Sequence, residues 1–470
     1  MYSINPQEKK PCIYLPVNLF IMGLLMVILF TAQLNVNASD SNEKTNIIYI
    51  LADDLGIGDV GCYGQELIKT PNIDKMADEG MMFTQHYSGS TVCAPSRCAL
   101  MTGFHMKNAD IKENPDPPLP LSTITVAEKL KDAGYATAMM GKWGLGEENT
   151  TGEPSKQGFD YYNGYLNQIL AHNSFPEYLL ENGQKIYLDN EVKYLSKDAW
   201  HKGLGSYSTE KNEYSNNIFT KEALRFIEDN QDNPFFLYLP YTIPHDNGEA
   251  PKDEKIEAPD MGIYKNKNWK ADQKRYAAII TLLDKYVGEI LDKIKSLHLD
   301  ENTLVIFTSD NGPEMGYYFC KSFDSNGKFR EGKRDLYEGG IRMPFIARWP
   351  GKIEPGSVSN HISAFWDFLP TACEIAHVPI PEGIDGISFL PALLQKEQPK
   401  HEYLYWEFSG RGGKKALRMN QWKAVINDIN NNPNPELELY DLNKDPGETN
   451  NVAKQNPGIS KKMEAFINNP

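Results

Sequence analysis

The chain has 470 residues, of which 40% are hydrophobic and 11% aromatic, so it can form one large domain and a smaller one around substantial cores. This composition excludes global disorder. The net charge of −15 and the pI near 5.2 argue against nucleic acid or another extended polyanion as a partner. Small anionic ligands remain compatible with the composition if a few cations converge in one pocket.

The N-terminal segment has the pattern of an export signal. Lys9 and Lys10 precede an apolar run over residues 15–31, and Val36-Asn37-Ala38 resembles a small-residue cleavage site. The run approaches the length that spans a membrane, so an anchor is the alternative. Export is favoured because polar residues follow at once without a charged stop-transfer cluster. We therefore expect residues 1–38 to be a signal peptide, a periplasmic or secreted protein, and no stable membrane insertion after cleavage.

Four short apolar segments are typical of strands buried on both faces of a sheet. They cover residues 46–52, 136–140, 235–239 and 303–308. Helical patterns fall between them: the strongest covers residues 272–296, another covers 221–230, and Ser122 is expected to cap a third. Strands that alternate with helices indicate a largely parallel sheet.

Each of these four strands leads into residues that can carry chemistry. The residues are Asp53 and Asp54, Lys142, His245, and Asp310 with Asn311. Taken singly, such groups are more often helix caps or solvated loop residues. The carboxyl ends of parallel strands meet at one edge of a sheet, so we expect these side chains to converge there. Oxygen donors from two strand ends would suit a hard cation.

The segment Cys93-Ala94-Pro95-Ser96-Arg97-Cys98 follows a polar run and leads into a short helix. A thiol near exposed backbone N–H groups and an arginine lies in a setting that favours negative charge. The alternative is a small buried thiol beside a proline turn. After signal removal five cysteines remain, an odd and sparse number that does not indicate a disulfide framework.

Residues 147–215 are rich in Tyr, Asn and Gly and show little periodicity, so we expect a long irregular segment with a functional role. Its rings could form a wall on which carbohydrate stacks, or could pack within the segment itself. The rings in question are Tyr161, Tyr162, Tyr165, His172 and Tyr178. From residue 391 the pattern changes to short strand-like segments, which indicates a main domain over 39–390 and a C-terminal subdomain over 391–470.

Several motifs together resemble those of the sulfatase family, and they span nearly all of the chain after the signal segment. The C-x-P-S-R pattern at Cys93 is similar to the signature whose cysteine is oxidised to formylglycine. The segment Gly134–Trp143 matches G-Y-x-T-x-x-x-G-K-W, and Gly332–Pro344 matches G-K-x-x-x-x-E-G-G-x-R-x-P. The residue pairs at the strand ends and the tail Glu438–Glu448 match further family motifs in the same order.

The resemblance implies an α/β fold of the alkaline-phosphatase type, with a mixed, largely parallel central sheet between helices and a smaller C-terminal antiparallel sheet. It also implies a metal site. The implied ligands of this site are Asp53, Asp54, Asp310 and Asn311, together with the modified Cys93. Oxygen ligands of this kind suit Ca²⁺, with Mg²⁺ second.

The resemblance also implies a mechanism. A formylglycine-generating enzyme oxidises Cys93, Arg97 holds the hydrated aldehyde, and one aldehyde hydroxyl attacks sulfur to give a covalent sulfo-enzyme. Lys142 and Lys333 neutralise the sulfate oxygens, and His245 protonates the departing sugar oxygen. The family often has a histidine directly after its lysine–tryptophan pair, whereas this chain has Gly144.

The expected activity is hydrolysis of sulfate monoesters, with sulfated galactose or N-acetylgalactosamine in glycans as the favoured substrates. One alternative is a phosphomonoesterase, phosphodiesterase or phosphonate hydrolase of the same superfamily. The second lysine, Lys333, and a single metal site favour sulfate over phosphate. The other alternative is a non-catalytic anion-binding protein in which Cys93 stays unmodified.

Overall fold

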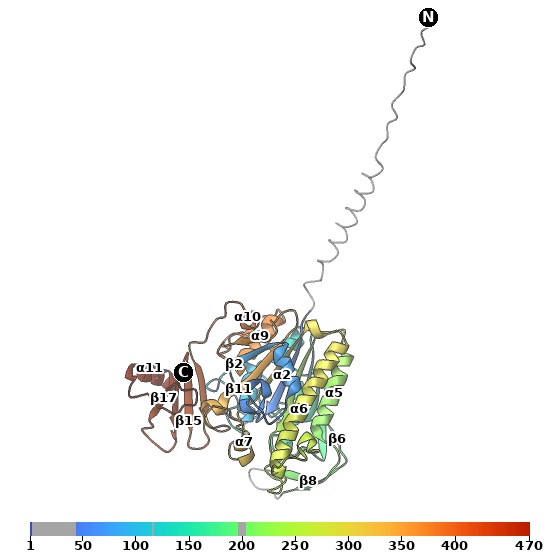
Figure 1. Ribbon diagram of the computed structural model, residues 1–470, viewed down its shortest axis with the longest axis horizontal. Coiled ribbons are helices and arrows are strands. Elements are labelled where there is room, and N and C mark those ends of the chain that lie inside the picture. Colours follow the sequence, from blue (N-terminus) through green and yellow to red (C-terminus); the bar gives the residue numbers. More distant parts are fainter. Residues whose placement is uncertain (2–43, 115–116, 196–203) are drawn as a thin grey trace. The chain divides into compact units, whose positions relative to one another are not determined.

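The computed structural model describes Met1 and residues 44–114, 117–195 and 204–470, so the expected signal peptide lies outside the described part beyond Met1. Residues Lys44–Pro470 form one compact unit. Figure 1 shows this unit with its large sheet in the middle and the C-terminal strands beside it. Within the described ranges, no helix combines the length and the apolar character needed to cross a bilayer.

The central sheet has eleven strands in the order β12-β2-β11-β10-β1-β9-β3-β4-β5-β6, and β13 also pairs with β2. The strands are β1 (Asn46–Asp53), β2 (Met81–Tyr87), β3 (Ala136–Lys142), β4 (Tyr161–Tyr165), β5 (Tyr178–Glu181), β6 (Gln184–Tyr187), β9 (Phe235–Pro244), β10 (Thr303–Ser309), β11 (Arg342–Arg348), β12 (Ser357–Ser359) and β13 (Ser363–Ala364). The four predicted strands β1, β3, β9 and β10 are neighbours and run parallel, while β11 is antiparallel to β10. The predicted mixed, largely parallel sheet is confirmed.

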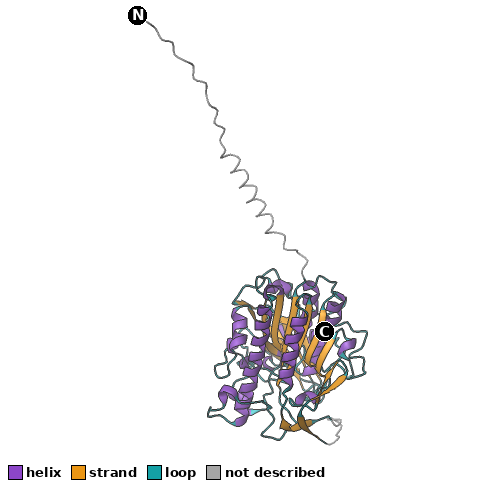
Figure 2. Cartoon of the chain, turned by 90° about the vertical axis from the view of Figure 1, so that its right-hand side faces the viewer, coloured by secondary structure: helices purple, strands orange, loops and turns teal. Residues whose placement is uncertain are grey.

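Helices cover both faces of this sheet, as Figure 2 shows. The longer ones are α2 (Pro71–Asp78), α3 (Cys93–Thr102), α4 (Val126–Asp132), α5 (Ser215–Asp229), α6 (Ala271–Ser296) and α9 (Phe368–Ile375), and the short ones are α7 (Tyr318–Ser322), α8 (Glu338–Ile341) and α10 (Leu390–Leu393). Apolar residues of α2, α5 and α6 belong to one core, and those of α3, α4 and α9 belong to the other. Because β1 lies between the two cores, both of its faces are apolar and Ile47–Leu51 are almost fully buried.

The helix expected to start at a Ser122 cap begins later, at Val126. Thr125 is its N-cap: the Thr125 side chain accepts a hydrogen bond from Glu128 N at 3.2 Å, and the Glu128 carboxylate accepts one from Thr125 N at 2.8 Å. This reciprocal pair is a capping box, which satisfies two free N–H groups where Ser122 would satisfy one.

The N-terminus of α2 is capped by a residue from another helix. Asp284 of α6 accepts hydrogen bonds from Asn72 N and Ile73 N, both at 2.8 Å, whereas the N-cap residue Thr70 makes no such bond. Asp284 is buried, so its carboxylate joins α2 to α6 in a place that water does not reach.

Asp284→Ala is therefore expected to lower the free energy of unfolding by about 2 kcal/mol, because it leaves two buried N–H groups without an acceptor. Urea unfolding would measure this loss. Asp292→Ala is the matched control, since Asp292 is an exposed residue of the same helix. Equal stability of the two variants would show that the interhelical cap contributes nothing.

The segment expected to be irregular is instead rich in short strands. It contributes β4, β5 and β6 to the edge of the large sheet and a separate hairpin of β7 (Asn190–Tyr194) with β8 (Ser206–Lys211). Tyr162 and Tyr165 are buried at 0% and 2% exposure, so their rings pack in the core. The strands were missed because pairing with β3, which lies far away in sequence, determines them rather than local periodicity.

The C-terminal strands form a four-stranded antiparallel sheet, as predicted. They are β14 (Leu404–Phe408), β15 (Lys414–Met419), β16 (Trp422–Asn427) and β17 (Leu437–Asp441), and α11 (Pro457–Asn468) packs against them. A buried ion cluster joins this sheet to the segment before β11. In it, Lys423 lies 2.9 Å from Glu338 and 3.1 Å from Glu448. The boundary at residue 390 stays a prediction.

Candidate active site

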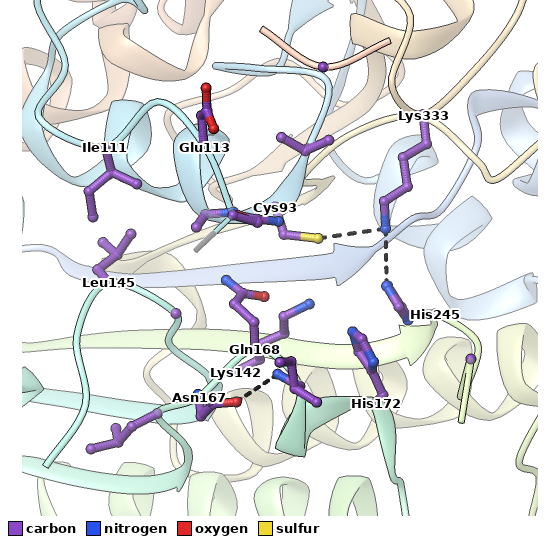
Figure 3. Close-up of a pocket in the computed structure, with 18 of the residues that line it drawn as sticks. Cys93, Ile111, Glu113, Lys142, Leu145, Asn167, Gln168, His172, His245 and Lys333 are labelled. Atoms are coloured by element: carbon purple, nitrogen blue, oxygen red, sulfur yellow. Dashed lines mark hydrogen bonds between the residues drawn. The ribbon is translucent and has the colours of Figure 1, made fainter. Parts of the chain in front are cut away.

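The predicted residues converge at the carboxyl edge of the central sheet. Asp53 and Lys142 end β1 and β3, while His245 and Asp310 directly follow β9 and β10. The first turn of α3 places Cys93 among them. Figure 3 shows Cys93 pointing toward Lys333, with His245 beyond it and Lys142 below. Strand ends that are far apart in sequence thus form one polar cluster, because neighbouring parallel strands end together.

Cys93 has both an acceptor and a donor within reach. Its thiol donates to Asp53 Oδ1 at 3.3 Å, and Lys333 Nζ lies 3.8 Å from its sulfur. Burial, together with the Asp53 charge, raises the pKa of the Cys93 thiol to about 12. The unmodified thiol is therefore neutral and a poor nucleophile near neutral pH.

Two lysines lie near this cysteine, and each is paired with a carboxylate. Lys142 Nζ lies 2.6 Å from Asp53 Oδ2, and Lys333 Nζ lies 2.7 Å from Asp54 Oδ2. All four groups are buried. Burial alone would raise the pKa of Asp53, but Lys142 and the other cations nearby hold it well below its usual range.

Lys333 also contacts His245, with 3.0 Å between Lys333 Nζ and His245 Nε2. The other ring nitrogen, Nδ1, lies 2.6 Å from the carbonyl oxygen of Asp246 and must donate to it. Nε2 is then the acceptor for the lysine. Burial and the Lys333 charge lower the pKa of His245 well below its usual value, so its ring is neutral in this arrangement.

Arg97 is fully buried and contacts carboxylates rather than Cys93. Its guanidinium donates to Asp310 Oδ2 at 2.7 and 3.0 Å and lies 3.5 Å from Asp53 Oδ2. It also donates to the carbonyl oxygen of Lys142 at 2.5 Å. The structure thus assigns Arg97 to positioning the acidic residues, and its predicted contact with a hydrated aldehyde at position 93 stays a prediction.

The acidic cluster fits a divalent cation. Ligand atoms of Asp53, Asp54, Cys93 and His245 all lie within 4.8 Å of one another. Burial and the Asp53 charge raise the pKa of Asp310 to about 7 although Arg97 opposes the shift, so these carboxylates compete for ionisation. A cation would relieve that competition.

Asn311 supplies a second reason for assigning a cation to this cluster. Its Nδ2 donates to Asp54 Oδ1 at 2.7 Å, whereas its Oδ1 is buried and has no hydrogen-bond partner among the described residues. A buried acceptor without a donor is costly, and a metal ion would satisfy it. Hard oxygen donors of this kind suit Ca²⁺ or Mg²⁺.

A cavity of about 690 Å³ opens above this cluster. The cavity is large enough for a saccharide. Its lining includes Cys93, Lys142, His245 and Lys333. Of the five rings that could have formed a stacking wall or packed within their own segment, only His172 lines the cavity, so the structure does not support the stacking wall. His172 stacks on His245 with 4.8 Å between ring centroids, and its Nδ1 lies 3.0 Å from Glu249.

The sequence analysis missed Gln168, which lies where a side chain at position 144 would point. Gly144 has a φ of +79°, and a Cβ there would come within 1.9 Å of Gln168 Nε2. This nitrogen is buried and has no hydrogen-bond partner among the described residues, and the residue lines the cavity together with Cys93 and Lys142. Figure 3 shows Gln168 next to Lys142 and below Cys93. The only sequence signal was the glycine itself.

The fold and this cluster of cations, carboxylates and an activatable side chain define a hydrolase of tetrahedral oxyanion esters. Comparison with known families gives a match to the Sulfatase model over residues 45–378 and to the N-sulphoglucosamine sulphohydrolase C-terminal model over residues 327–468. The chain belongs to the sulfatase family, and it is a sulfuric ester hydrolase.

Individual relatives agree with this assignment. The N-acetylgalactosamine-6-O-sulfatase of Bacteroides thetaiotaomicron is 31% identical, over 91% of this chain and 93% of the relative. The human N-acetylgalactosamine-6-sulfatase is 33% identical, over 77% of this chain and 68% of the relative. A solved Bacteroides thetaiotaomicron structure, from work on glycosaminoglycan metabolism, superposes with a TM-score of 0.74 at 28% identity, over 91% of this chain and 99% of that one.

Proposed function

We propose that this enzyme removes sulfate from galactose or N-acetylgalactosamine residues of glycans, with the 6-sulfate as the first candidate. The observation that carries the proposal is that Cys93 lines a saccharide-sized cavity together with Lys142 and Lys333. The names of two relatives, both N-acetylgalactosamine-6-sulfatases, support the choice of sugar and position.

Residue 93 is proposed to be formylglycine, installed by a formylglycine-generating enzyme, and its hydrated aldehyde supplies the hydroxyl nucleophile. The side chains around Cys93 suit two hydroxyls, because Asp53 accepts and Lys333 donates at this position. Asp53, Asp54, Asp310 and Asn311, with residue 93, are proposed to hold Ca²⁺, or less favourably Mg²⁺, which would stabilise negative charge on the sulfate.

The two lysines are proposed to bind the sulfate oxygens and to stabilise the charge that develops on them. Each lysine is already held by a carboxylate at 2.6 or 2.7 Å, so little reorganisation is needed when substrate arrives. Lys333 Nζ also donates to His245 Nε2, 3.0 Å away. His245 lines the cavity, and it is proposed to take a proton from solvent there and to deliver it to the departing sugar oxygen, while Lys333 keeps its charge.

The substrate assignment is tested by measuring sulfate release from 6-sulfated and 4-sulfated N-acetylgalactosamine and from 6-sulfated galactose, beside the matching phosphate esters. We expect the highest kcat/KM on a 6-sulfate. Faster hydrolysis of the phosphate esters would instead support the phosphoesterase or phosphonate hydrolase alternative. Binding without turnover by protein in which residue 93 is found as unmodified cysteine would support the non-catalytic alternative.

Added Ca²⁺ is expected to raise the unfolding temperature, since a ligand at a hundred times its Kd contributes about 2.7 kcal/mol. Asp310→Ala should abolish this response. The response should also weaken as the pH falls through about 7, because Asp310 binds a proton there and Ca²⁺ must displace it. A Ca²⁺ response that is the same at pH 8 and pH 6 would argue against Asp310 as a ligand.

Gln168 is proposed to donate its free N–H either to a sulfate oxygen or to a hydroxyl of residue 93. Gln168→Leu keeps the bulk that packs against Gly144 but removes the donor. We expect kcat/KM to fall about tenfold to a hundredfold, the range for one hydrogen bond to a charged group, with an unchanged unfolding temperature. Turnover equal to that of the unaltered enzyme would show that the buried amide only packs against Gly144 and donates no hydrogen bond during the reaction.

Export and domain limits are part of the same proposal. The polar glycan substrate and the N-terminal pattern support a protein that is periplasmic or secreted, with residues 1–38 removed. The catalytic domain is proposed to cover residues 39–390 and the C-terminal subdomain residues 391–470. Cell fractionation with N-terminal sequencing of the mature protein tests both the location and the cleavage site.

A further inference from the structure

A second cavity, of about 250 Å³, lies between the end of β2 and the C-terminal sheet. Its basic and imidazole lining residues are Arg418, Lys400, His361 and His401, Tyr403 adds a phenol, and amide side chains provide much of the rest. No Asp or Glu is among the described residues that line it. This lining is unusual for a chain with a net charge of −15.

Arg418 of β15 is the buried cation of this cavity, at 2% exposure. Its Nε donates to the carbonyl oxygen of Asn420 at 2.9 Å, and its two terminal nitrogens contact the Tyr87 hydroxyl and Gln85 Oε1. All three partners are neutral. Among the described residues, no carboxylate forms an ion pair with Arg418 within 4.0 Å.

The closest link to a carboxylate runs through a hydroxyl. Tyr87, which accepts from Arg418, donates to Glu338 Oε2 at 2.7 Å. Glu338 is already paired with Arg342 at 2.9 Å and with Lys423 at 2.9 Å. The negative charge of Glu338 therefore compensates two other cations, and it compensates little of the positive charge of Arg418.

The other two buried arginines of the described part are fully paired. Arg97 is held by Asp310 at 2.7 Å, and Arg348 is held by Asp300 at 2.7 Å and by Glu79 at 2.8 Å. Burial lowers the pKa of Arg418 to about 9, and only the more distant Glu448 opposes this shift. Buried charges in proteins are normally compensated, so Arg418 has an unmet need for an anion.

We propose that this cavity is a second oxyanion site, in which Arg418 anchors a sulfate group that is either inorganic sulfate or a sulfate ester on a saccharide. An arginine with N–H groups not used by its three neutral partners suits the oxygens of a tetrahedral anion. Lys400 at the exposed rim adds a second positive charge, whereas His401 is already paired with Asp367 at 2.7 Å.

The size and position of the cavity separate this site from the active site. About 250 Å³ is below the usual range for a drug-sized ligand, so it accommodates an anion or one sugar ring. Tyr403 and Leu404, at the start of β14, line this cavity, whereas Phe408 at the strand's end lines the active-site cavity. Five strand residues span roughly 16 Å, so one sulfate cannot occupy both.

Crystals of the full chain soaked in selenate test the proposal directly, because anomalous scattering locates the anion. We expect a peak within hydrogen-bonding distance of the Arg418 guanidinium that is absent in Arg418→Gln. No peak there in the unaltered protein at saturating selenate would overturn the proposal. A peak in the active-site cavity reports on the proposed function separately, so the two ideas can fail independently.

Titration calorimetry of Cys93→Ala protein, in which no sugar sulfate is hydrolysed, with inorganic sulfate and then with N-acetylgalactosamine 6-sulfate measures the Arg418 site as a second binding event beside that of the active site. It gives the affinity of the second site and separates the two sources. Arg418→Gln should weaken this site about tenfold to a hundredfold, and Lys400→Gln, at the exposed rim, about two- to fivefold. Lys415→Gln is the matched control, since it removes a lysine of the same strand that does not line the cavity, and it should bind as the unaltered protein does.

The calorimetric outcomes are decisive in both directions. A second equivalent of bound inorganic sulfate identifies the free anion as a ligand of this cavity, and a second equivalent of the sugar sulfate alone identifies the ester. If Arg418→Gln and Lys400→Gln both bind as tightly as Lys415→Gln, the cavity is not an oxyanion site. Retained turnover by Arg418→Gln at the active site would show that this variant is folded.

Discussion

Cys93→Ala is expected to abolish sulfate release, with a loss of at least ~10⁴-fold in kcat, while the unfolding temperature changes little. Residue 93 is the only side chain of the cluster that is proposed to form a bond to the sulfur of the sulfate. Its neighbours only assist that bond, so removing the nucleophile eliminates the covalent route. The unfolding temperature should hold because Ala fits the first turn of α3 and leaves the ion pairs of Lys142 and Lys333 in place.

Cys98→Ala is the matched control for this prediction. Cys98 lies on the same helix and is equally buried, but it does not line the active-site cavity. We expect this variant to keep its turnover. Full activity of Cys93→Ala, measured on a 6-sulfated sugar with the product sulfate quantified, would contradict the proposed nucleophile.

His245→Ala is expected to reduce sulfate release from sugars by roughly 10²–10⁴-fold and from a nitrophenyl sulfate much less. Sugar alkoxides are poor leaving groups and need a proton in the transition state, whereas nitrophenolate leaves readily without one. His245 lines the active-site cavity, and its Nε2, 3.0 Å from Lys333 Nζ, is the nitrogen that is proposed to carry this proton to the sugar oxygen.

The two substrates must be compared in the same variant. If His245 only helps to bind the sulfate, which both substrates share, both should lose kcat/KM about equally. Equal losses would therefore remove the general-acid role. A Lys333→Ala variant should instead lower the activity on both substrates, because Lys333 contacts Asp54 and is proposed to bind the common sulfate.

The sequence could predict the central sheet and most of the candidate site. The apolar runs before Asp53 and Asp310 are too long and too β-branched for surface segments, and the run before Lys142 is almost wholly apolar, so all three had to be buried strands. Once four such strands alternate with helices, their carboxyl ends meet at one edge. The convergence of these residues follows from that topology without knowledge of any side-chain conformation.

Features set by contacts between distant segments could not be predicted. The sequence left open whether Tyr162 and Tyr165 form a binding wall or pack internally, and it is the pairing of β4 with β3 that buries both rings. The cap of α2 by Asp284 of α6 leaves no local signal, since 212 positions separate Asp284 from Asn72. Gln168 was missed because only the three-dimensional structure shows that the Gln168 side chain fills the space where a side chain of residue 144 would lie.

The measurement that tests the central claim most directly is the mass of the peptide that contains residue 93, taken from active protein. If Cys93 is the precursor of the nucleophile, the peptide should be lighter by the difference between a CH₂SH and a CHO group. When the protein is produced together with a formylglycine-generating enzyme, the fraction of residue 93 that is converted should rise, and the apparent kcat should rise in proportion to that fraction. Full sulfatase activity in protein whose residue 93 is wholly cysteine would contradict the account.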